Sequence, residues 1–257
     1  MSIIKLALRK YIKIKDLSTF KNPLFIGPHP DDIEFGCGAL ISKLKEKNAD
    51  IHFVIVTDGA AGSKDPKIDS KTLKQIRTSE AKEASSYLGV STIDFLEFMD
   101  GGSYEIEDVI KKLCPYILKY KPDIIFSPDP NLSTECHIDH LKVSSAFRDA
   151  SQILLYQNSL LSHGVSMEGL SPLDKPPFIA YYFTDRPNHY EKVNKKNIDD
   201  MVNALHLHKS QMEGGGDALI TYFKLKMKVN GLKHFKGNAM EFRVLHPLMQ
   251  HCYSSGE

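Results

Sequence analysis

The chain has 257 residues, of which 42% are hydrophobic, 9% aromatic and 25% charged. This composition is ordinary for a globular protein and excludes a disordered tail, a collagen-like repeat and a coiled-coil rod. The 33 Lys and Arg residues nearly balance the 32 Asp and Glu residues, so the formal net charge is +1. Because there is no basic excess, we expect no nucleic-acid partner and no electrostatic attraction to an anionic membrane.

Cysteines and apolar segments indicate the compartment. The four cysteines lie far apart and form no CxxC pair, so we expect free thiols rather than a disulfide scaffold or a cysteine zinc site. The first residues are basic and apolar, but no long apolar stretch and no small-residue cleavage site follow them. No run of about 18 apolar residues occurs in the sequence. We therefore expect a cytoplasmic protein with no membrane-inserted segment, and we assign no role to the leader segment, residues 1–21.

Two hydrophobic periods alternate along the first part of the chain. Runs rich in β-branched and aromatic residues predict strands at 23–26, 51–56, 93–98, 123–126 and 178–183. These runs are apolar on both faces, which is typical of buried parallel strands. Between them, apolar residues at helical spacing predict helices around 40–44, 73–88 and 109–118. Strand followed by helix, repeated, predicts an α/β fold: a Rossmann-like three-layer sandwich with a mostly parallel sheet.

The alternation breaks down after about residue 157. Glycines and prolines between 164 and 177 predict a long loop before the strand at 178–183, and a further helix is predicted over 198–212. No internal repeat or linker divides the chain. We therefore expect a single domain over residues 1–257 with an elaborated C-terminal third.

Two groups of His and Asp follow the first and fourth predicted strands. The first is His29-Pro30-Asp31-Asp32, and the second is His137-Ile138-Asp139-His140 at the start of a helix. Ligands of open α/β sheets bind at the carboxyl ends of the strands, in the crevice where the strand order reverses. Strands one and four can be neighbours at that point, so the sequence predicts that the two groups face each other.

Imidazole nitrogens and carboxylate oxygens together suit Zn²⁺, with Fe²⁺ or Co²⁺ as other candidates. His29 and Asp32 can supply two ligands from one loop, and His140 can supply the third. Three protein ligands leave a fourth position open for a water molecule, whose pKa the metal lowers. The spacing therefore predicts a catalytic rather than a structural metal site.

The remaining polar residues of the two groups have catalytic roles in this prediction. Asp31 is adjacent to Asp32, so its side chain should diverge and stay free as a general base. His137 precedes His140 by three residues on a predicted helix, so both should project from one face and His137 should point at the reacting carbonyl. Asp139 could then orient His137, as a carboxylate does for a paired imidazole.

Each motif also has a purely structural interpretation. Residues 30–32 would make a good turn and helix N-cap, and Arg77 could form a surface ion pair with Glu80. The small-residue loop 57–63 could present backbone amides to a substrate or be a plain turn. Residues 36–41 lack the third glycine of a dinucleotide-binding loop, so we expect no NAD. Both His/Asp groups fall at strand ends, which favours a functional site.

In combination, the two groups resemble the signature motifs of the PIG-L/LmbE-like N-acetylglucosaminyl deacetylases. The first motif extends to Ile33-Glu34 and the glycines after it. Weaker likenesses extend the resemblance over about residues 23–245: Thr57-Asp58-Gly59 with Gly62, Arg77, Glu80, Ala84, Leu88-Gly89-Val90, Asp100-Gly101, His208-Lys209-Ser210-Gln211 and Glu241-Phe242.

The resemblance implies a Zn²⁺-dependent hydrolase with a Rossmann-like fold that removes the N-acetyl group from an N-acetylglucosamine-type conjugate. By motif position it implies metal ligands His29, Asp32 and His140, a general base Asp31, an oxyanion-stabilising His137 oriented by Asp139, and sugar or aglycone contacts from Arg77 and Asp100. Three positions depart from the family pattern, namely Pro28, Ala39 and Ile138. None of them removes a ligand or the base, so the departures concern substrate details.

Two other functions fit the same residues. One is a metal-dependent amidase or esterase acting on a non-sugar conjugate, and the other is a non-catalytic metal-binding protein on the same fold. The second is weaker because Asp31 and His137 would then be surplus to the metal site. The expected partner is a small-molecule amino-sugar conjugate. The aglycone, the native metal and the oligomeric state, including a homo-oligomer, are left open by the sequence.

Overall fold

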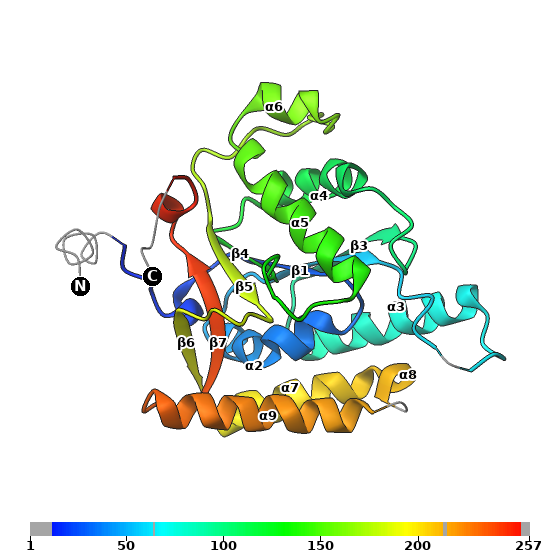
Figure 1. The fold of residues 1–257 in the computed structure, drawn as a ribbon, viewed down its shortest axis with the longest axis vertical. Coiled ribbons are helices and arrows are strands. Elements are labelled where there is room, and N and C mark those ends of the chain that lie inside the picture. The colour runs from blue at the N-terminus through cyan, green and yellow to red at the C-terminus, as the bar shows by residue number, and fades with distance from the viewer. Residues whose placement is uncertain (1–11, 64, 213–214, 253–257) are drawn as a thin grey trace.

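The computed structural model describes residues 12–63, 65–212 and 215–252. Within these ranges, seven strands form a sheet in the order β3–β2–β1–β4–β5–β7–β6 (Figure 1). They are β1 (Pro23–Gly27), β2 (His52–Thr57), β3 (Thr92–Phe98), β4 (Ile124–Pro128), β5 (Phe178–Tyr182), β6 (His189–Val193) and β7 (Asn238–Leu245). Strands β1 to β5 pair with one another in parallel, whereas β7 runs antiparallel to β5 and β6. The predicted mostly parallel sheet is confirmed.

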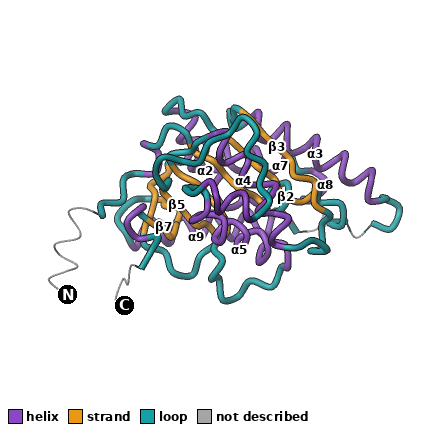
Figure 2. The backbone as a smooth tube through the Cα atoms, turned by 90° about the horizontal axis from the view of Figure 1, so that it is seen from above, coloured by secondary structure: helices purple, strands orange, loops and turns teal. Residues whose placement is uncertain are grey.

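Helices cover both faces of this sheet and form the predicted three layers (Figure 1). One face is covered by α4 (Ile106–Tyr120), α5 (Ile138–Ile153) and α6 (Gln157–Ser162). The other face is covered by α2 (Asp32–Glu46), α3 (Ser70–Tyr87), α7 (Lys195–Leu207) and α9 (Gly216–Lys233), with the short α8 (Lys209–Met212) after α7. Figure 2 shows the strands running through the middle of the molecule with helices around them. Each helix of the described chain is too short or too polar to span a membrane.

The central strands are apolar because they are enclosed. Every residue of β1, β2 and β4 is buried, as expected for parallel strands covered on both faces. Helix α2 lies close to the sheet at Gly36, where an added Cβ would come within 2.3 Å of the Tyr182 ring. The Tyr182 hydroxyl donates a 2.7 Å hydrogen bond to the Ile26 carbonyl. These contacts fix the start of α2 above the end of β1.

The C-terminal third contains elements that the sequence did not predict. Strands β6 and β7 and helix α9 lie there, and β7 alternates buried and partly exposed residues rather than forming a continuous apolar run. The helix predicted over 198–212 is two helices, because the chain breaks at His208 between α7 and α8. Of the leader segment, residues 1–11 lie outside the described residues. Leu17 in the short 3₁₀ helix Leu17–Thr19 is buried, and its amide donates to Glu191 Oε2 at 2.9 Å.

The strand order reverses between β1 and β4. From β1 the sheet continues to β2 and β3 on one side, and from β4 it continues to β5 on the other. This is the crevice at which open α/β folds bind ligands. The two predicted His/Asp groups follow these two strands, so the fold places them at the same edge of the sheet.

Candidate metal centre and active site

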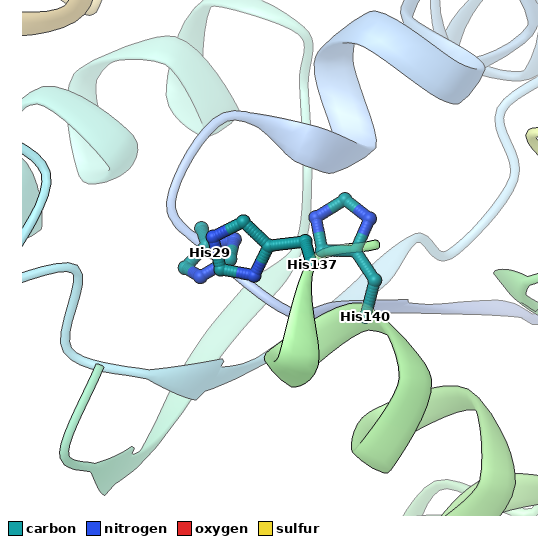
Figure 3. Close-up of side chains that lie close together, drawn as sticks. All are labelled: His29, His137 and His140. Atoms are coloured by element: carbon teal, nitrogen blue, oxygen red, sulfur yellow. The ribbon is translucent and has the colours of Figure 1, made fainter. Parts of the chain in front are cut away.

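Three histidines from distant parts of the sequence meet at this crevice (Figure 3). His29 lies in the loop between β1 and α2, whereas His137 and His140 lie at the start of α5. The ring centroid of His29 is 4.5 Å from that of His137 and 5.3 Å from that of His140. The prediction that the two groups face each other is confirmed by these distances.

Asp32 lies close to both histidines that are predicted as metal ligands. Asp32 Oδ2 lies 3.1 Å from His29 Nδ1 and 3.2 Å from His140 Nε2. Ligand atoms that surround Zn²⁺ tetrahedrally at 2.0–2.2 Å are separated by about 3.3–3.6 Å. The chemistry of two imidazoles and one carboxylate, with the carboxylate at nearly that distance from each imidazole, therefore fits Zn²⁺ or a similar divalent cation.

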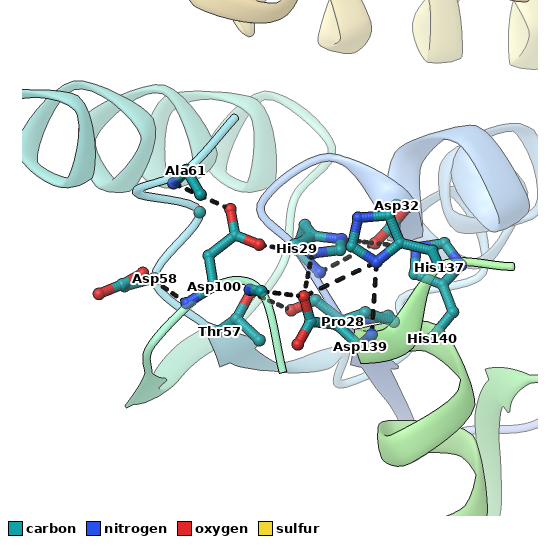
Figure 4. A network of polar contacts seen from close by, with 12 residues as sticks. Pro28, His29, Asp32, Thr57, Asp58, Ala61, Asp100, His137, Asp139 and His140 are labelled. Carbon is teal, nitrogen blue, oxygen red and sulfur yellow. Dashed lines mark hydrogen bonds and ion pairs between the residues drawn. The ribbon is translucent and has the colours of Figure 1, made fainter. Parts of the chain in front are cut away.

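The second ring nitrogen of each of these two histidines faces a carboxylate, and Figure 4 shows Asp100 and Asp139 beside His29. His140 Nδ1 is 2.9 Å from Glu135 Oε2, and His29 Nε2 is 3.2 Å from both Asp100 Oδ1 and Asp139 Oδ2. Carboxylates in this position orient metal-binding imidazoles and raise their basicity. Glu135 was not predicted from the sequence as a site residue, although it lies only two residues before His137 and accepts a 2.8 Å hydrogen bond from the His137 amide.

The carboxylates favour positive charge at the centre of the cluster. Burial lowers the pKa of His29, but hydrogen bonds to Asp100, Asp139 and Asp32 outweigh burial and raise the pKa to about 12. The pKa of His140 is lowered by burial and raised more strongly by Asp32, to about 9. A surrounding that holds protons on imidazoles in this way also favours a divalent cation in their place.

His137 is placed differently from the other two histidines. It is the N-cap residue of α5 and not part of the helix, and its Nδ1 accepts the backbone N–H of Asp139 at 3.3 Å. The His137 side chain is 49% exposed, and burial together with His29 and His140 lowers its pKa. The ligand atoms of His29, His137 and His140 lie within 4.8 Å of one another, as do those of His29, Asp100, His137 and Asp139, whereas Asp32 belongs to neither group. The geometry thus allows His137 either to bind a cation or to face a substrate.

Asp31 diverges from Asp32, as the adjacent positions predicted. It is the N-cap residue of α2, yet its side chain makes no capping hydrogen bond. Instead Asp31 Oδ1 lies 3.2 Å from Arg77 Nη2. The backbone of Asp31 has φ 145°, a conformation that is costly for a residue with a side chain. Burial raises the pKa of Asp31 to about 6 against the opposing charge of Arg77. The N-cap interpretation of this carboxylate is therefore wrong.

Arg77 holds the loop that carries Asp31. It is 3% exposed and donates to the carbonyls of Gly59 and Pro30, each at 3.1 Å. The predicted surface ion pair between Arg77 and Glu80 is also wrong, because both side chains are buried and Glu80 accepts hydrogen bonds from the amide and hydroxyl of Ser210 at 2.9 and 2.6 Å. The spacing of Arg77 and Glu80 predicts that they share one face of α3, but it does not reveal that this face is buried.

Asp139 and Asp100 are engaged by other groups of the site. The fully buried Asp139 accepts from the Tyr104 hydroxyl at 2.7 Å and from the Gly101 amide at 2.9 Å, whereas His137 Nδ1 is 3.7 Å away. Asp100 accepts from the Ala61 amide at 3.1 Å. Asp139 is therefore nearer to His29 than to His137. The Ala61 amide, in the loop 57–63, is bonded to Asp100 and so is not presented to a substrate.

His208 is a second residue that the sequence analysis passed over. It is fully buried at the break between α7 and α8, with Nε2 3.4 Å from Glu34 Oε1. Burial lowers the pKa of His208, but Glu34 and then Asp31 raise it above its usual value. The only sequence signal was its place in the family-like segment 208–211. Through His208 and Ser210, the C-terminal third packs beside Asp31.

Two adjoining clefts lie beside the cluster. The polar cleft has a volume of about 590 Å³ and is lined by Asp31, Ser63, Asp65 and Gln211, among others. The apolar cleft has a volume of about 320 Å³; Asp32 and His140 form its inner end. Its side walls include Leu132, Phe183, Tyr222 and Phe223. Phe35 and Leu219 line both clefts, so the two meet beside the predicted ligands.

Comparison with known proteins gives the family. The model of the PIG-L family, described as GlcNAc-PI de-N-acetylase, matches residues 24–151. The chain is 30% identical over 191 residues to diacetylchitobiose deacetylase of Thermococcus kodakarensis, which covers 74% of this chain and 70% of that protein. The chain therefore belongs to the PIG-L family, as its motifs predicted.

Solved structures agree with the fold. The structure of N,N'-diacetylchitobiose deacetylase from Pyrococcus horikoshii superposes with a TM-score of 0.89 at 26% identity, covering 100% of this chain and 98% of that one. The structure of GalB, the 4-carboxy-2-hydroxymuconate hydratase of Pseudomonas putida KT2440, gives a TM-score of 0.73 at 16% identity, covering 88% of this chain and 97% of that one. Because a hydratase shares the fold, the reaction has to be argued from the site.

Proposed function

We propose that the protein is a metal-dependent hydrolase that removes the N-acetyl group from an N-acetylglucosamine-type amino sugar conjugate. The observation that carries the proposal is the position of the Asp31 carboxylate. It makes no capping hydrogen bond to α2 and instead pairs with Arg77 beside the predicted metal ligands. A site that only bound a metal would have no use for this second, separately held carboxylate. The diacetylchitobiose deacetylase relatives support the choice of an N-acetylated sugar as the substrate.

We assign the metal to His29, Asp32 and His140, and we choose Zn²⁺ because of the mixed nitrogen and oxygen donors. When bound, the metal would polarise the amide carbonyl and lower the pKa of a water molecule. Glu135 would hold the His140 ring, and Asp100 and Asp139 would hold His29.

The protein's own groups would move the proton and stabilise the charge. Asp31 would take a proton from the attacking water and pass it to the leaving amine. His137 accepts the Asp139 amide at Nδ1, so its neutral ring carries its proton on Nε2 and can donate to the oxyanion. The C–N amide bond then breaks, and acetate and a free amino sugar leave.

Three residues change role in this proposal. Asp139, which the resemblance assigned to orienting His137, is assigned to holding His29, because its carboxylate is 3.2 Å from His29 Nε2 and 3.7 Å from His137 Nδ1. The resemblance implied that Arg77 and Asp100 contact the sugar or aglycone. Arg77 is 3% exposed and the Asp100 side chain 7% exposed, so both have little surface to offer a substrate. We therefore assign Arg77 to positioning Asp31, and Asp100 to positioning His29.

The test is the release of a primary amine. The metal-loaded protein is incubated with diacetylchitobiose, with other N-acetylglucosamine conjugates and with non-sugar acetamides, and amine and acetate are measured together. We expect both products in equal amounts from at least one sugar conjugate. Amine from non-sugar amides alone would make the protein an amidase of another class. No amine from any compound would leave the non-catalytic metal-binding function.

A further inference from the structure

We propose that the apolar cleft binds the acyl group of the substrate, and that the enzyme prefers amino sugars whose N-acyl chain is longer than acetyl. The inference rests on the proposed function and specifies its substrate. It concerns the cleft formed between the loops after β4 and β5 and helix α9.

Several polar groups that line this cleft are already paired within the protein. At its inner end, Glu135 faces His140 at 2.9 Å. The Thr184 hydroxyl donates to Asp129 at 2.5 Å, and the Lys226 ammonium lies 2.5 Å from a Glu241 carboxylate oxygen. A sugar in this cleft would lose its hydrogen bonds to water and find these groups occupied, which is unfavourable. An alkyl chain has no such cost.

Aromatic side chains form the wall that leads away from the cluster. The Phe183 ring is parallel to the His140 ring, with centroids 6.2 Å apart and 4° between the planes. Phe223 lies 5.7 Å from Phe183, and Tyr222 lies 5.3 Å from Phe223. Phe183 has a left-handed backbone, with φ 52°, which is an uncommon conformation for a bulky residue. The backbone energy is therefore raised at the residue whose ring lies beside His140, a predicted metal ligand.

The direction of the reaction assigns one cleft to each half of the substrate. Asp31 passes its proton to the leaving amine, so the amino sugar has to lie on the Asp31 side. That side is the polar cleft, where Ser63, Asp65 and Gln211 can serve the sugar hydroxyls. The apolar cleft adjoins the polar one at Phe35 and Leu219 and is lined by Asp32 and His140, so it is the cleft that remains for the other substituent of the acyl carbon.

The size of the apolar cleft exceeds what acetyl requires. A methyl group occupies a volume on the order of that of one water molecule, which takes about 30 Å³ in the liquid. The cleft volume of about 320 Å³ is therefore several times larger than the methyl of an acetyl group. A chain of several carbons would fill it and remove more apolar surface from water.

The chain-length series tests this inference. N-acetyl-, N-butyryl-, N-hexanoyl- and N-octanoylglucosamine are compared by kcat/KM for amine release from the metal-loaded protein. Water supplies the hydroxyl to the acyl carbon and the proton to the amine for every chain length, so only the chain differs. We expect kcat/KM to rise up to about fourfold for each added methylene until the cleft is full. Highest activity on acetyl, with a fall at every longer chain, would overturn the inference and leave the proposed function intact. No amine from any chain length would overturn both.

Two variants test the location of the acyl group. Leu132→Trp fills the cleft and Tyr222→Ala removes part of its outer wall. Both should lower the ratio of hexanoyl to acetyl kcat/KM at least tenfold. The matched control is Leu225→Trp, on the same helix α9 but 59% exposed and outside both clefts; its ratio should equal that of the unmodified protein. An unchanged ratio in both cleft variants would contradict the placement.

Discussion

Replacement of Arg77 by Met removes the guanidinium that faces Asp31. The variant loses the 3.2 Å ion pair and leaves the carbonyls of Gly59 and Pro30 without their donor. Both partners of the pair are largely buried, with side chains 4% and 14% exposed. Removal of one member of such a pair costs about 3–5 kcal/mol of unfolding free energy. We therefore expect Arg77→Met to lower the urea midpoint by roughly 1.5 M, at an m-value near 2.5 kcal/mol per M.

The activity of the same variant reports on Asp31. Without the Arg77 charge, burial raises the pKa of Asp31 further above its usual value, so the base is protonated over more of the pH range. We expect the acid limb of the kcat/KM profile to move to higher pH. The assay combines urea unfolding with amine release across pH for Arg77→Met, Asp31→Asn and the double variant. Coupling below about 0.5 kcal/mol between the two positions, with an unmoved acid limb, would refute the pairing.

Three further results are expected. Asp31→Asn should lower kcat about 10²- to 10⁴-fold while metal content measured by atomic absorption stays constant, because Asp31 lies outside the ligand set; a loss of metal would contradict this. Glu135→Gln should weaken metal affinity about 10- to 100-fold in chelator competition, because His140 loses its carboxylate, and the exposed Glu168→Gln control should have no effect. Burial lowers the pKa of His52, so this residue's contribution to stability is full above about pH 6.5 and is lost as the pH falls. The decrease in unfolding free energy from pH 8 to pH 5 should therefore be smaller in His52→Asn, and an equal decrease would exclude His52 as its source.

The parallel strands could be predicted because strands that helices cover on both faces have continuous apolar sequences. A strand covered by helices on both faces is apolar at every position, as in 124–126 of β4. Strand β7 alternates buried and partly exposed residues and has no such continuous apolar sequence. Helix α9 carries exposed apolar residues such as Leu225 and Leu232 opposite its buried ones, so apolar residues occur around the whole helix and no single face stands out.

The candidate site could be predicted where chemistry is concentrated in short motifs. His29, Asp32 and His140 come together because their motifs follow the two strands at which the sheet order reverses. Residues whose role depends on partners far away in the sequence do not form short motifs and could not be predicted in this way. His208 meets Glu34 from 174 positions away in the sequence, and the burial of Arg77 becomes visible only when its carbonyl partners are placed.

The central claim is that a single divalent cation binds to side chains from the β1 and β4 ends of the sheet. A crystal structure of the zinc-loaded protein, with anomalous scattering to locate the metal, tests it most directly. We predict one strong peak about 2.0–2.2 Å from His29 Nδ1, Asp32 Oδ2 and His140 Nε2, with Asp31 outside coordination distance. A metal bound instead by His137, Asp100 and Asp139, or no peak in the crevice, would contradict the account.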